Sequence, residues 1–328
     1  MPKISVDKQI RTFVKDHISK QEKLDEKEKL PPLMQAIKAV HSAYSSGGSL
    51  SEEDLKRQRS GQELFSRLVT PPIGVSSKAL AVKGITCEWT KPERSYDRKH
   101  IILYCHGGGY TCGSINYARI LASKLALHTG LAVFSFAYRL APENPYPAAI
   151  EDVVSIWDYL MQKGYGAGDI IVSGDSAGGN LALELCLELR RHDRMLPGGL
   201  VLMSPWTDMT MSGVSYSERL AIDPMLTPVY IEACKKAYAG EEADFARPQF
   251  SPLFSDFLDY PPTLVQAGTN EILLSDSAVL VEKLQVCGVF AALEVYEDSW
   301  HVFQQMPLKR SSRAMDSIGE FIWSHIIR

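Results

Sequence analysis

A short stretch around Ser176 combines the residue types that could turn a serine hydroxyl into a nucleophile. The β-branched run Ile170–Val172 leads into Gly-Asp-Ser-Ala-Gly, and an apolar, helix-like segment follows from Ala177. This G-x-S-x-G pattern between a strand and a helix is typical of a sharp turn that presents its serine at the carboxyl edge of a sheet. Glycines must flank the serine because the turn brings backbone segments close together. The alternative is a glycine-rich turn whose serine has no chemical role.

Consecutive glycines, Gly107–Gly109, follow an apolar run and His106 earlier in the chain. Side chains do not cover their backbone N–H groups, and an acyl-transfer enzyme needs such donors for its oxyanion. We therefore expect Gly108, Gly109 and the residue after the serine, Ala177, to form an oxyanion hole. His106 is interpreted as a residue that braces this loop. A flexible glycine loop is the alternative, but its pairing with the serine motif favours the catalytic interpretation.

A serine hydroxyl is a poor nucleophile unless a base takes its proton. In enzymes with this nucleophile turn, the acid and then the histidine follow the serine along the chain. The histidines after the serine are His192, His301 and His325. His192 would end the helix after the serine, where a cation is favourable, and His325 falls in the last expected helix. His301 follows a strand that ends near Tyr296, so the sequence predicts that this loop histidine is the base.

The acid that orients the histidine should follow the strand expected over Thr263–Ala267. Asn270, Glu271 and Asp276 come after it. A neutral amide cannot stabilise an imidazolium as an anion does. Glu271 is the nearest carboxylate and is favoured, whereas Asp276 is interpreted as a cap or first-turn acid of the next helix. Asp276 and the neutral Asn270 stay open as alternatives.

Motifs that fall in one order along the chain resemble those of a known enzyme family. They are His106–Gly109, Tyr138–Glu143 with Pro147–Ala149 after it, Gly174–Asn180 and His301–Phe303. Together they resemble the hormone-sensitive-lipase-like branch of the α/β-hydrolases, the bacterial carboxylesterases of lipolytic family IV, over residues 85–328. Many members have Asp-Pro-Leu where this chain has Glu271-Ile272-Leu273, which aligns if glutamate replaces aspartate.

The resemblance implies an α/β-hydrolase fold with a mostly parallel, eight-stranded sheet flanked by helices. It also implies a helical cap over the site, no metal and no cofactor, and small-molecule ester substrates with short to medium acyl chains. We therefore expect residues 1–75 to be an N-terminal cap segment. Residues 76–328 would form the catalytic domain, with a cap insertion at about 213–245, where polar, helix-like sequence interrupts the pattern.

The periodicity of the chain agrees with an α/β fold, because apolar runs alternate with amphipathic segments after a charged, helix-rich start. Helices are expected in the first part at 10–26 and 52–68. Strands are expected at 84–90, 100–104, 131–136, 170–172, 200–203, 263–266 and 291–296, and further helices at 116–129, 148–163, 275–286 and 312–327. Strands that alternate with helices indicate a parallel sheet whose ligand site lies at the carboxyl ends of the strands.

Aromatic residues near the predicted site are candidates for the wall of an acyl pocket. They are Trp206, Tyr216 and Phe303, and ordinary core packing is the alternative for each. Two other functions compete with a carboxylesterase: a lactone or amide hydrolase with the same catalytic residues, and a non-catalytic member of the fold that binds a small molecule. The shape of the pocket, which the sequence does not define, would distinguish a lactone or amide hydrolase from a carboxylesterase.

Composition and charge exclude several classes of protein. The chain has 328 residues, 45% of them hydrophobic and 23% charged, and a formal net charge of −4, so nothing favours nucleic-acid binding. It starts with a polar segment and has no long apolar run, so neither an export signal nor stable membrane insertion is expected. The six cysteines form no C-x-x-C pair and are expected as thiols of a cytoplasmic protein. An exposed sheet edge near residues 290–296 makes a homodimer plausible.

Overall fold

The structure, a computed structural model, describes residues 50–94 and 96–327. Within them an eight-stranded sheet has the order β1-β2-β4-β3-β5-β6-β7-β8. Its strands are β1 (Val75–Val82), β2 (Ile85–Pro92), β3 (Asp97–Cys105), β4 (Leu131–Phe136), β5 (Ile170–Asp175), β6 (Gly199–Met203), β7 (Thr263–Gly268) and β8 (Ala291–Tyr296). β2 is antiparallel to both of its neighbours, whereas all other pairs are parallel. The mostly parallel eight-stranded sheet expected from the sequence is therefore confirmed.

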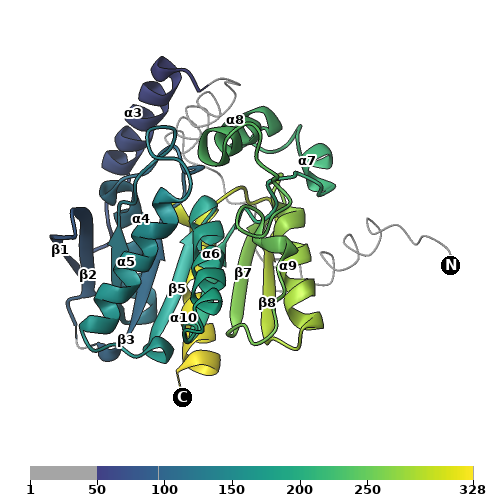
Figure 1. The fold of residues 1–328 in the computed structure, drawn as a ribbon. Helices are drawn as coiled ribbons and strands as arrows, with labels where there is room; N and C mark the ends of the chain where they lie inside the picture. The colour runs from purple at the N-terminus through teal and green to yellow at the C-terminus, as the bar shows by residue number, and fades with distance from the viewer. Residues whose placement is uncertain (1–49, 95, 328) are drawn as a thin grey trace.

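Helices cover both faces of the sheet (Figure 1). One face carries α4 (Ile115–Thr129) and α10 (Lys309–Phe321), and the other α5 (Ala148–Gln162), α6 (Ala177–Arg191) and α9 (Leu274–Val286). Successive strand residues point to opposite faces, so Ile102 and Tyr104 pack with the first set, and Ile101 and Leu103 with the second. Burial on both faces explains why the central strands are continuously apolar.

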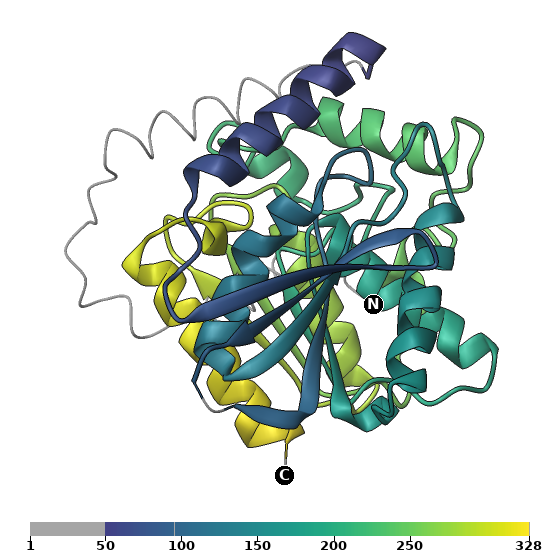
Figure 2. The same ribbon diagram turned by 90° about the vertical axis from the view of Figure 1, so that its left-hand side faces the viewer.

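Further helices lie beyond the carboxyl ends of the parallel strands. They are α3 (Glu52–Leu68), α7 (Ser215–Glu218) and α8 (Pro228–Ala239). Figure 2 shows α3 running obliquely over this end of the sheet. Ser51 caps α3, because its hydroxyl accepts a hydrogen bond from the N–H of Asp54 at 3.2 Å. These helices bring residues 52–68 and the 213–245 stretch to the edge where a ligand site is expected.

Some elements differ from the sequence-based expectation. β1 was not predicted, because it is an edge strand whose side chains are mostly exposed and show no apolar alternation. α10 ends at Phe321 and continues as one π-helical turn, Ile322–Ile326, where an α-helix to residue 327 was expected. The helix expected at 10–26 lies outside the described residues. No helix in the described part of the chain is long and apolar enough to cross a membrane.

Candidate active site

Ser176 occupies the sharp turn between β5 and α6. β5 ends at Asp175 and α6 begins at Ala177, so a single residue joins strand to helix. Its backbone has φ 53° and ψ −121°, a conformation that residues with a side chain rarely adopt. A Cβ atom on Gly178 would lie 2.0 Å from the carbonyl oxygen of Cys105. The close approach of these two backbone segments explains why the motif requires glycine.

The structure brings Ser176, Glu271 and His301 together from separate segments of the chain. Nε2 of His301 lies 2.9 Å from Oγ of Ser176, and Nδ1 of His301 lies 2.8 Å from Oε2 of Glu271. Glu271 is fully buried, and His301 is 5% exposed. An ionised carboxylate favours a proton on Nδ1, which leaves the Nε2 lone pair to accept the hydroxyl proton of the serine. This arrangement can activate Ser176 as a nucleophile.

Neither Asp276 nor Asn270, the two alternatives to Glu271, is hydrogen-bonded to His301 in the part of the chain that the structure describes. Oδ2 of Asp276 accepts hydrogen bonds from the N–H groups of Thr207 and Asp208, each at 2.9 Å. Burial raises the pKa of Asp276 well above its usual value. The side-chain oxygen of Asn270 lies 3.3 Å from the hydroxyl of the preceding threonine. Glu271 is thus the candidate acid that contacts the histidine.

Ser204, which the sequence motifs did not identify, holds the carboxylate of Glu271. Its Oγ donates a hydrogen bond to Oε1 of Glu271 at 3.0 Å and accepts one from the N–H of Val302 at 3.1 Å. The N–H of Gly268 also donates to Oε1, at 2.6 Å. Ser204 therefore connects the acid loop to the residue after His301. The sequence feature that could have identified Ser204 is its position directly after the buried strand β6, at the carboxyl edge of the sheet.

We expect Ser204→Ala to lower kcat for p-nitrophenyl butyrate about tenfold, because Glu271 and the His301 loop lose a shared anchor. The buried N–H of Val302 also loses its acceptor, so the melting temperature should fall. Steady-state kinetics and thermal unfolding measure the two effects. Ser277→Ala is the matched control, since its buried hydroxyl has no partner among the described residues. Equal kcat in both variants would contradict the positioning role of Ser204.

The glycine loop after β3 offers free backbone donors. Gly108 and Gly109 have φ values of 118° and 61°, and a Cβ atom on Gly108 would lie 2.3 Å from the carbonyl oxygen of Cys112. Within residues 50–94 and 96–327, the N–H groups of Gly108, Gly109 and Ala177 donate to no hydrogen bond. Ala177 is the first residue of α6, where the helix dipole favours negative charge. These donors suit the oxyanion role expected from the sequence.

Asp175 ties the glycine loop to the nucleophile turn. Its Oδ1 accepts hydrogen bonds from the N–H of Gly107, at 2.8 Å, and from the hydroxyl of Tyr104. Burial raises the pKa of Asp175 to about 6. A Cβ atom on Gly107 would lie 2.3 Å from Oδ2. The aspartate inside the serine motif therefore fixes where the glycine loop begins, a contact that the motif alone did not reveal.

His106 has the geometry of a loop brace, as expected. Its ring stacks on Tyr138 with a centroid distance of 4.2 Å, and Nδ1 lies 2.8 Å from the carbonyl oxygen of Gly107. Burial lowers the pKa of His106 to about 4, so the ring is neutral at physiological pH. This histidine thus stabilises the glycine loop from the side of the Tyr138–Glu143 motif, whose sequence is YRLAPE.

Lys124 of α4 holds the other side of the site. Its Nζ donates hydrogen bonds to the carbonyl oxygens of Gln304 and Met306, at 2.6 and 2.7 Å. Burial lowers the pKa of Lys124 to about 7. The lysine therefore fixes the segment that follows His301, although it is far from that segment in the sequence.

The aromatic residues expected near an acyl pocket are all buried, in different surroundings. The backbone N–H of Trp206 donates to the carbonyl oxygen of Ser176 at 3.0 Å, so this residue lies beside the nucleophile turn. The hydroxyl of Tyr216 lies 3.4 Å from Oδ2 of Asp276. The ring of Phe303 packs against an aromatic neighbour on β8, with a centroid distance of 4.9 Å. Their role as pocket walls stays a prediction.

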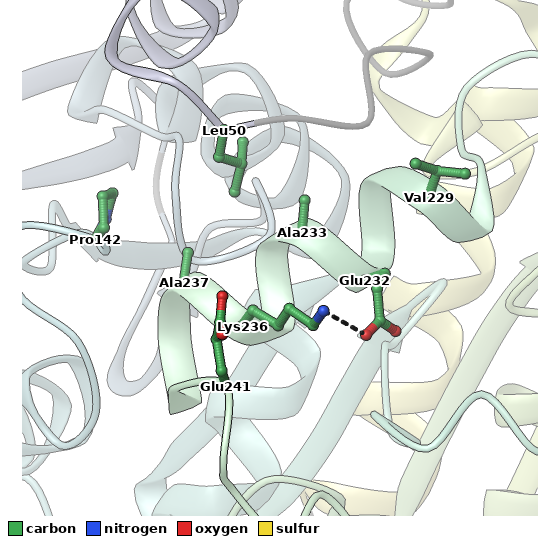
Figure 3. Close-up of a pocket in the computed structure, with 8 residues that line it drawn as sticks. All are labelled: Leu50, Pro142, Val229, Glu232, Ala233, Lys236, Ala237 and Glu241. Atoms are coloured by element: carbon green, nitrogen blue, oxygen red, sulfur yellow. Dashed lines mark ion pairs between the residues drawn. The ribbon is translucent and has the colours of Figure 1, made fainter.

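A surface hollow of about 390 Å³ lies on the outer side of α8 (Figure 3). It is lined by Leu50, Pro142, Val229, Glu232, Ala233, Lys236, Ala237 and Glu241. The opposite side of the helix faces the glycine loop, since a Cβ atom on Gly109 would lie 2.7 Å from Sγ of Cys234. The hollow is therefore separated from the serine by α8. Among the described residues, no group of three or more His, Cys, Asp or Glu side chains could hold a metal ion.

Comparisons with known proteins agree with this geometry. Residues 102–305 match a family model described as the alpha/beta hydrolase fold. An esterase from Acinetobacter venetianus is 36% identical over 252 residues, 76% of this chain and 82% of that protein. An acetyl-hydrolase from Streptomyces hygroscopicus is 34% identical over 263 residues, 80% of this chain and 86% of that protein.

A crystal structure of another protein is also similar to the structure of this chain. A crystal structure of an esterase from the bacterial hormone-sensitive lipase family superposes with a TM-score of 0.83 and 31% identity. The alignment covers 91% of this chain and 99% of that chain. The residues matched by the family model include the glycine loop, the serine turn, Glu271 and His301.

Proposed function

Because the chain belongs to the α/β-hydrolase family, as a carboxylesterase of its hormone-sensitive-lipase-like branch, we propose that it cleaves short- to medium-chain acyl esters through an acyl-enzyme on Ser176. The protein is a carboxylic ester hydrolase. The observation that carries the residue assignment is the continuous series of contacts from Ser176 through His301 to Glu271. The acetyl-hydrolase among its relatives supports a preference for short acyl chains.

In the first half of the reaction, Oγ of Ser176 attacks the ester carbonyl carbon while Nε2 of His301 takes the hydroxyl proton. Glu271 holds the imidazole in the required tautomer and stabilises the positive charge that forms on it. Nε2–H then gives the proton to the leaving alkoxide. The ester C–O bond breaks, the alcohol departs, and the acyl group stays on Ser176.

In the second half, His301 takes a proton from a water molecule that attacks the acyl carbon. The tetrahedral intermediate collapses, the bond to Oγ breaks, and the proton returns to the serine. In both halves, the N–H groups of Gly108, Gly109 and Ala177 bind the oxyanion. Such preorganised donors are usually the largest electrostatic contribution to catalysis. Among the residues that the structure describes, these N–H groups have no other acceptor, which supports this assignment.

We assign the described part of residues 1–75, from residue 50 on, and about 213–245 to a cap over the catalytic domain formed by residues 76–328; residues 1–49 of the expected cap segment lie outside the described part of the chain. The location of α3, α7 and α8 beyond the carboxyl ends of the strands supports this division. A cap at this edge would exclude water and shape the pocket for the acyl chain. The homodimer, the absence of a nucleic-acid partner and the cytoplasmic location remain predictions from the sequence.

The competing functions differ in what they require of the same residues. A lactone or amide hydrolase would use the same serine, acid and histidine and differ only in how the pocket holds the leaving group. A non-catalytic binding protein would not need the Ser176–His301 contact at 2.9 Å, and the presence of that contact favours an enzyme.

A substrate panel tests the proposed function. We expect p-nitrophenyl acetate, butyrate and octanoate to be hydrolysed with a higher kcat/KM than p-nitrophenyl palmitate, a lactone or a p-nitroanilide. Mixing enzyme with p-nitrophenyl butyrate should also release a burst of p-nitrophenol equal to the enzyme concentration if the acyl-enzyme accumulates. Faster hydrolysis of the lactone or anilide than of every ester would contradict the substrate assignment.

A further inference from the structure

The helix α3 contacts the segment that directly follows the glycine motif. Oε1 of Gln58 lies 3.6 Å from Sγ of Cys112. The carboxylate of Glu63 accepts hydrogen bonds from the hydroxyl of Ser114 at 3.1 Å and from the side-chain amide of Asn116 at 2.7 Å. α3 is therefore packed against the far side of the loop whose glycines offer the oxyanion donors.

Arg59 makes the most direct of these contacts. Its Nε donates a hydrogen bond to the carbonyl oxygen of Thr111 at 2.9 Å. One terminal nitrogen also donates to the carbonyl oxygen of Ala141, and both terminal nitrogens bind the carboxylate of Glu143 at 2.7 Å. The guanidinium thus joins α3, the glycine loop and the YRLAPE loop. Glu143 fixes its orientation through a bidentate pair.

Two peptide groups connect Arg59 with the oxyanion site. The Thr111 carbonyl and the Cys112 N–H belong to one planar peptide group, and this N–H donates to the carbonyl of Gly108 at 2.9 Å. The Gly108 carbonyl and the Gly109 N–H belong to the next such group. Because N–H and C=O point in opposite directions across a trans peptide, fixing the Gly108 carbonyl also fixes the direction of the Gly109 N–H.

We propose that Arg59 is a positioning residue for ester hydrolysis, which aims and polarises the Gly109 N–H through these two peptide groups. The proposal rests on the function proposed above, in which the Gly109 N–H binds the oxyanion. Hydrogen bonds in series strengthen one another, and a cationic donor at one end increases the effect. Through Arg59, α3 thereby contributes to catalysis without touching the substrate.

The charge of Arg59 persists at every pH at which an esterase is assayed. The hydrogen bonds to Glu143 raise the pKa of Arg59 further above its ordinary value. The same hydrogen bonds lower the pKa of Glu143 to about 2. A change of pH in the assay range therefore does not remove the charge of Arg59, so its influence on the Gly109 N–H is tested by substitution.

Arg59→Met removes the charge and the donors but keeps an unbranched side chain that can pack against the loop. We expect kcat for p-nitrophenyl butyrate to fall about tenfold, less than for loss of a whole oxyanion donor, with KM nearly unchanged. A trifluoromethyl ketone, whose adduct with Ser176 places an oxyanion in the same site, should bind weaker by the same factor. Arg59→Lys keeps the charge and should recover part of both losses.

Arg57→Met is the matched control, because Arg57 lies on the exposed side of α3 and pairs with Glu53 of the same helix. It should leave kcat and ketone binding unchanged. Ser176→Ala is measured in parallel. Full activity of Ser176→Ala would overturn the proposed function, whereas an inactive Ser176→Ala with a fully active Arg59→Met would overturn the positioning role alone.

Rates are expressed per titrated active site, so that a loss of folded protein is not counted as a loss of catalysis. If kcat and ketone affinity of Arg59→Met equal those of the wild type while only the melting temperature falls, Arg59 is merely structural. Should Arg59→Met not fold, Glu143→Gln decides, because it replaces the bidentate ion pair that orients the guanidinium by a weaker contact with a neutral amide. We then expect a fall of about threefold in kcat and in ketone affinity, and unchanged values would overturn the proposal.

Discussion

Ser176→Ala is expected to lower kcat for p-nitrophenyl butyrate about 10⁵- to 10⁶-fold, because no other group can form the acyl-enzyme. The residual rate would come from the oxyanion donors and from substrate binding. Alanine keeps the Cβ atom of serine, so the turn with φ 53° should be no more strained than in the wild type. Steady-state kinetics and circular dichroism of both proteins measure activity and folding.

Ser173→Ala provides the control for this experiment. Ser173 is buried in β5, and its hydroxyl has no hydrogen-bond partner within the described residues. Removing it should leave kcat unchanged and stability equal or slightly higher. Turnover by Ser176→Ala comparable with that of Ser173→Ala would show that another residue is the nucleophile.

Glu271→Gln should lower kcat about 10⁴-fold, because the amide favours the wrong tautomer of the histidine. If the amide oxygen keeps the hydrogen bonds from Ser204 and Gly268, the amide N–H group faces Nδ1 of His301. The ring proton is then on Nε2, and the imidazole can no longer accept the proton of Ser176. The change should appear in kcat more than in KM, measured with p-nitrophenyl butyrate.

Asp276→Asn tests whether Asp276, and not Glu271, is the acid that orients His301. Its amide oxygen can still accept the hydrogen bonds from Thr207 and Asp208, so the variant should fold and keep kcat within a few-fold of wild type. An inactive Asp276→Asn beside a nearly normal Glu271→Gln would show that Asp276 orients the base.

Local backbone geometry was predictable from the sequence because short-range sterics determine it. The glycines around Ser176 are required by a turn that brings Gly178 against the carbonyl of Cys105, and such a requirement is visible in the motif. The buried central strands were also visible, as continuous apolar runs. The edge strand β1 was missed because an exposed strand imposes no apolar pattern on its residues.

The choice of the acid needed tertiary structure. Glu271, Asn270 and Asp276 follow the same strand, and only the path of the chain after β7 decides which one contacts His301. An alignment that replaces aspartate by glutamate favours Glu271 but does not supply the distance.

The class of fold was thus readable from the sequence alone, which also predicted the serine, the histidine and the glycine loop, because each prediction depends on residues that are neighbours in the chain. The supporting contacts of Ser204, Lys124 and Arg59 were decided only by the tertiary structure. Each of them joins segments far apart in the sequence, which the parallel sheet brings together at its carboxyl edge. Such contacts leave no local pattern, since the partner's identity depends on packing rather than on spacing.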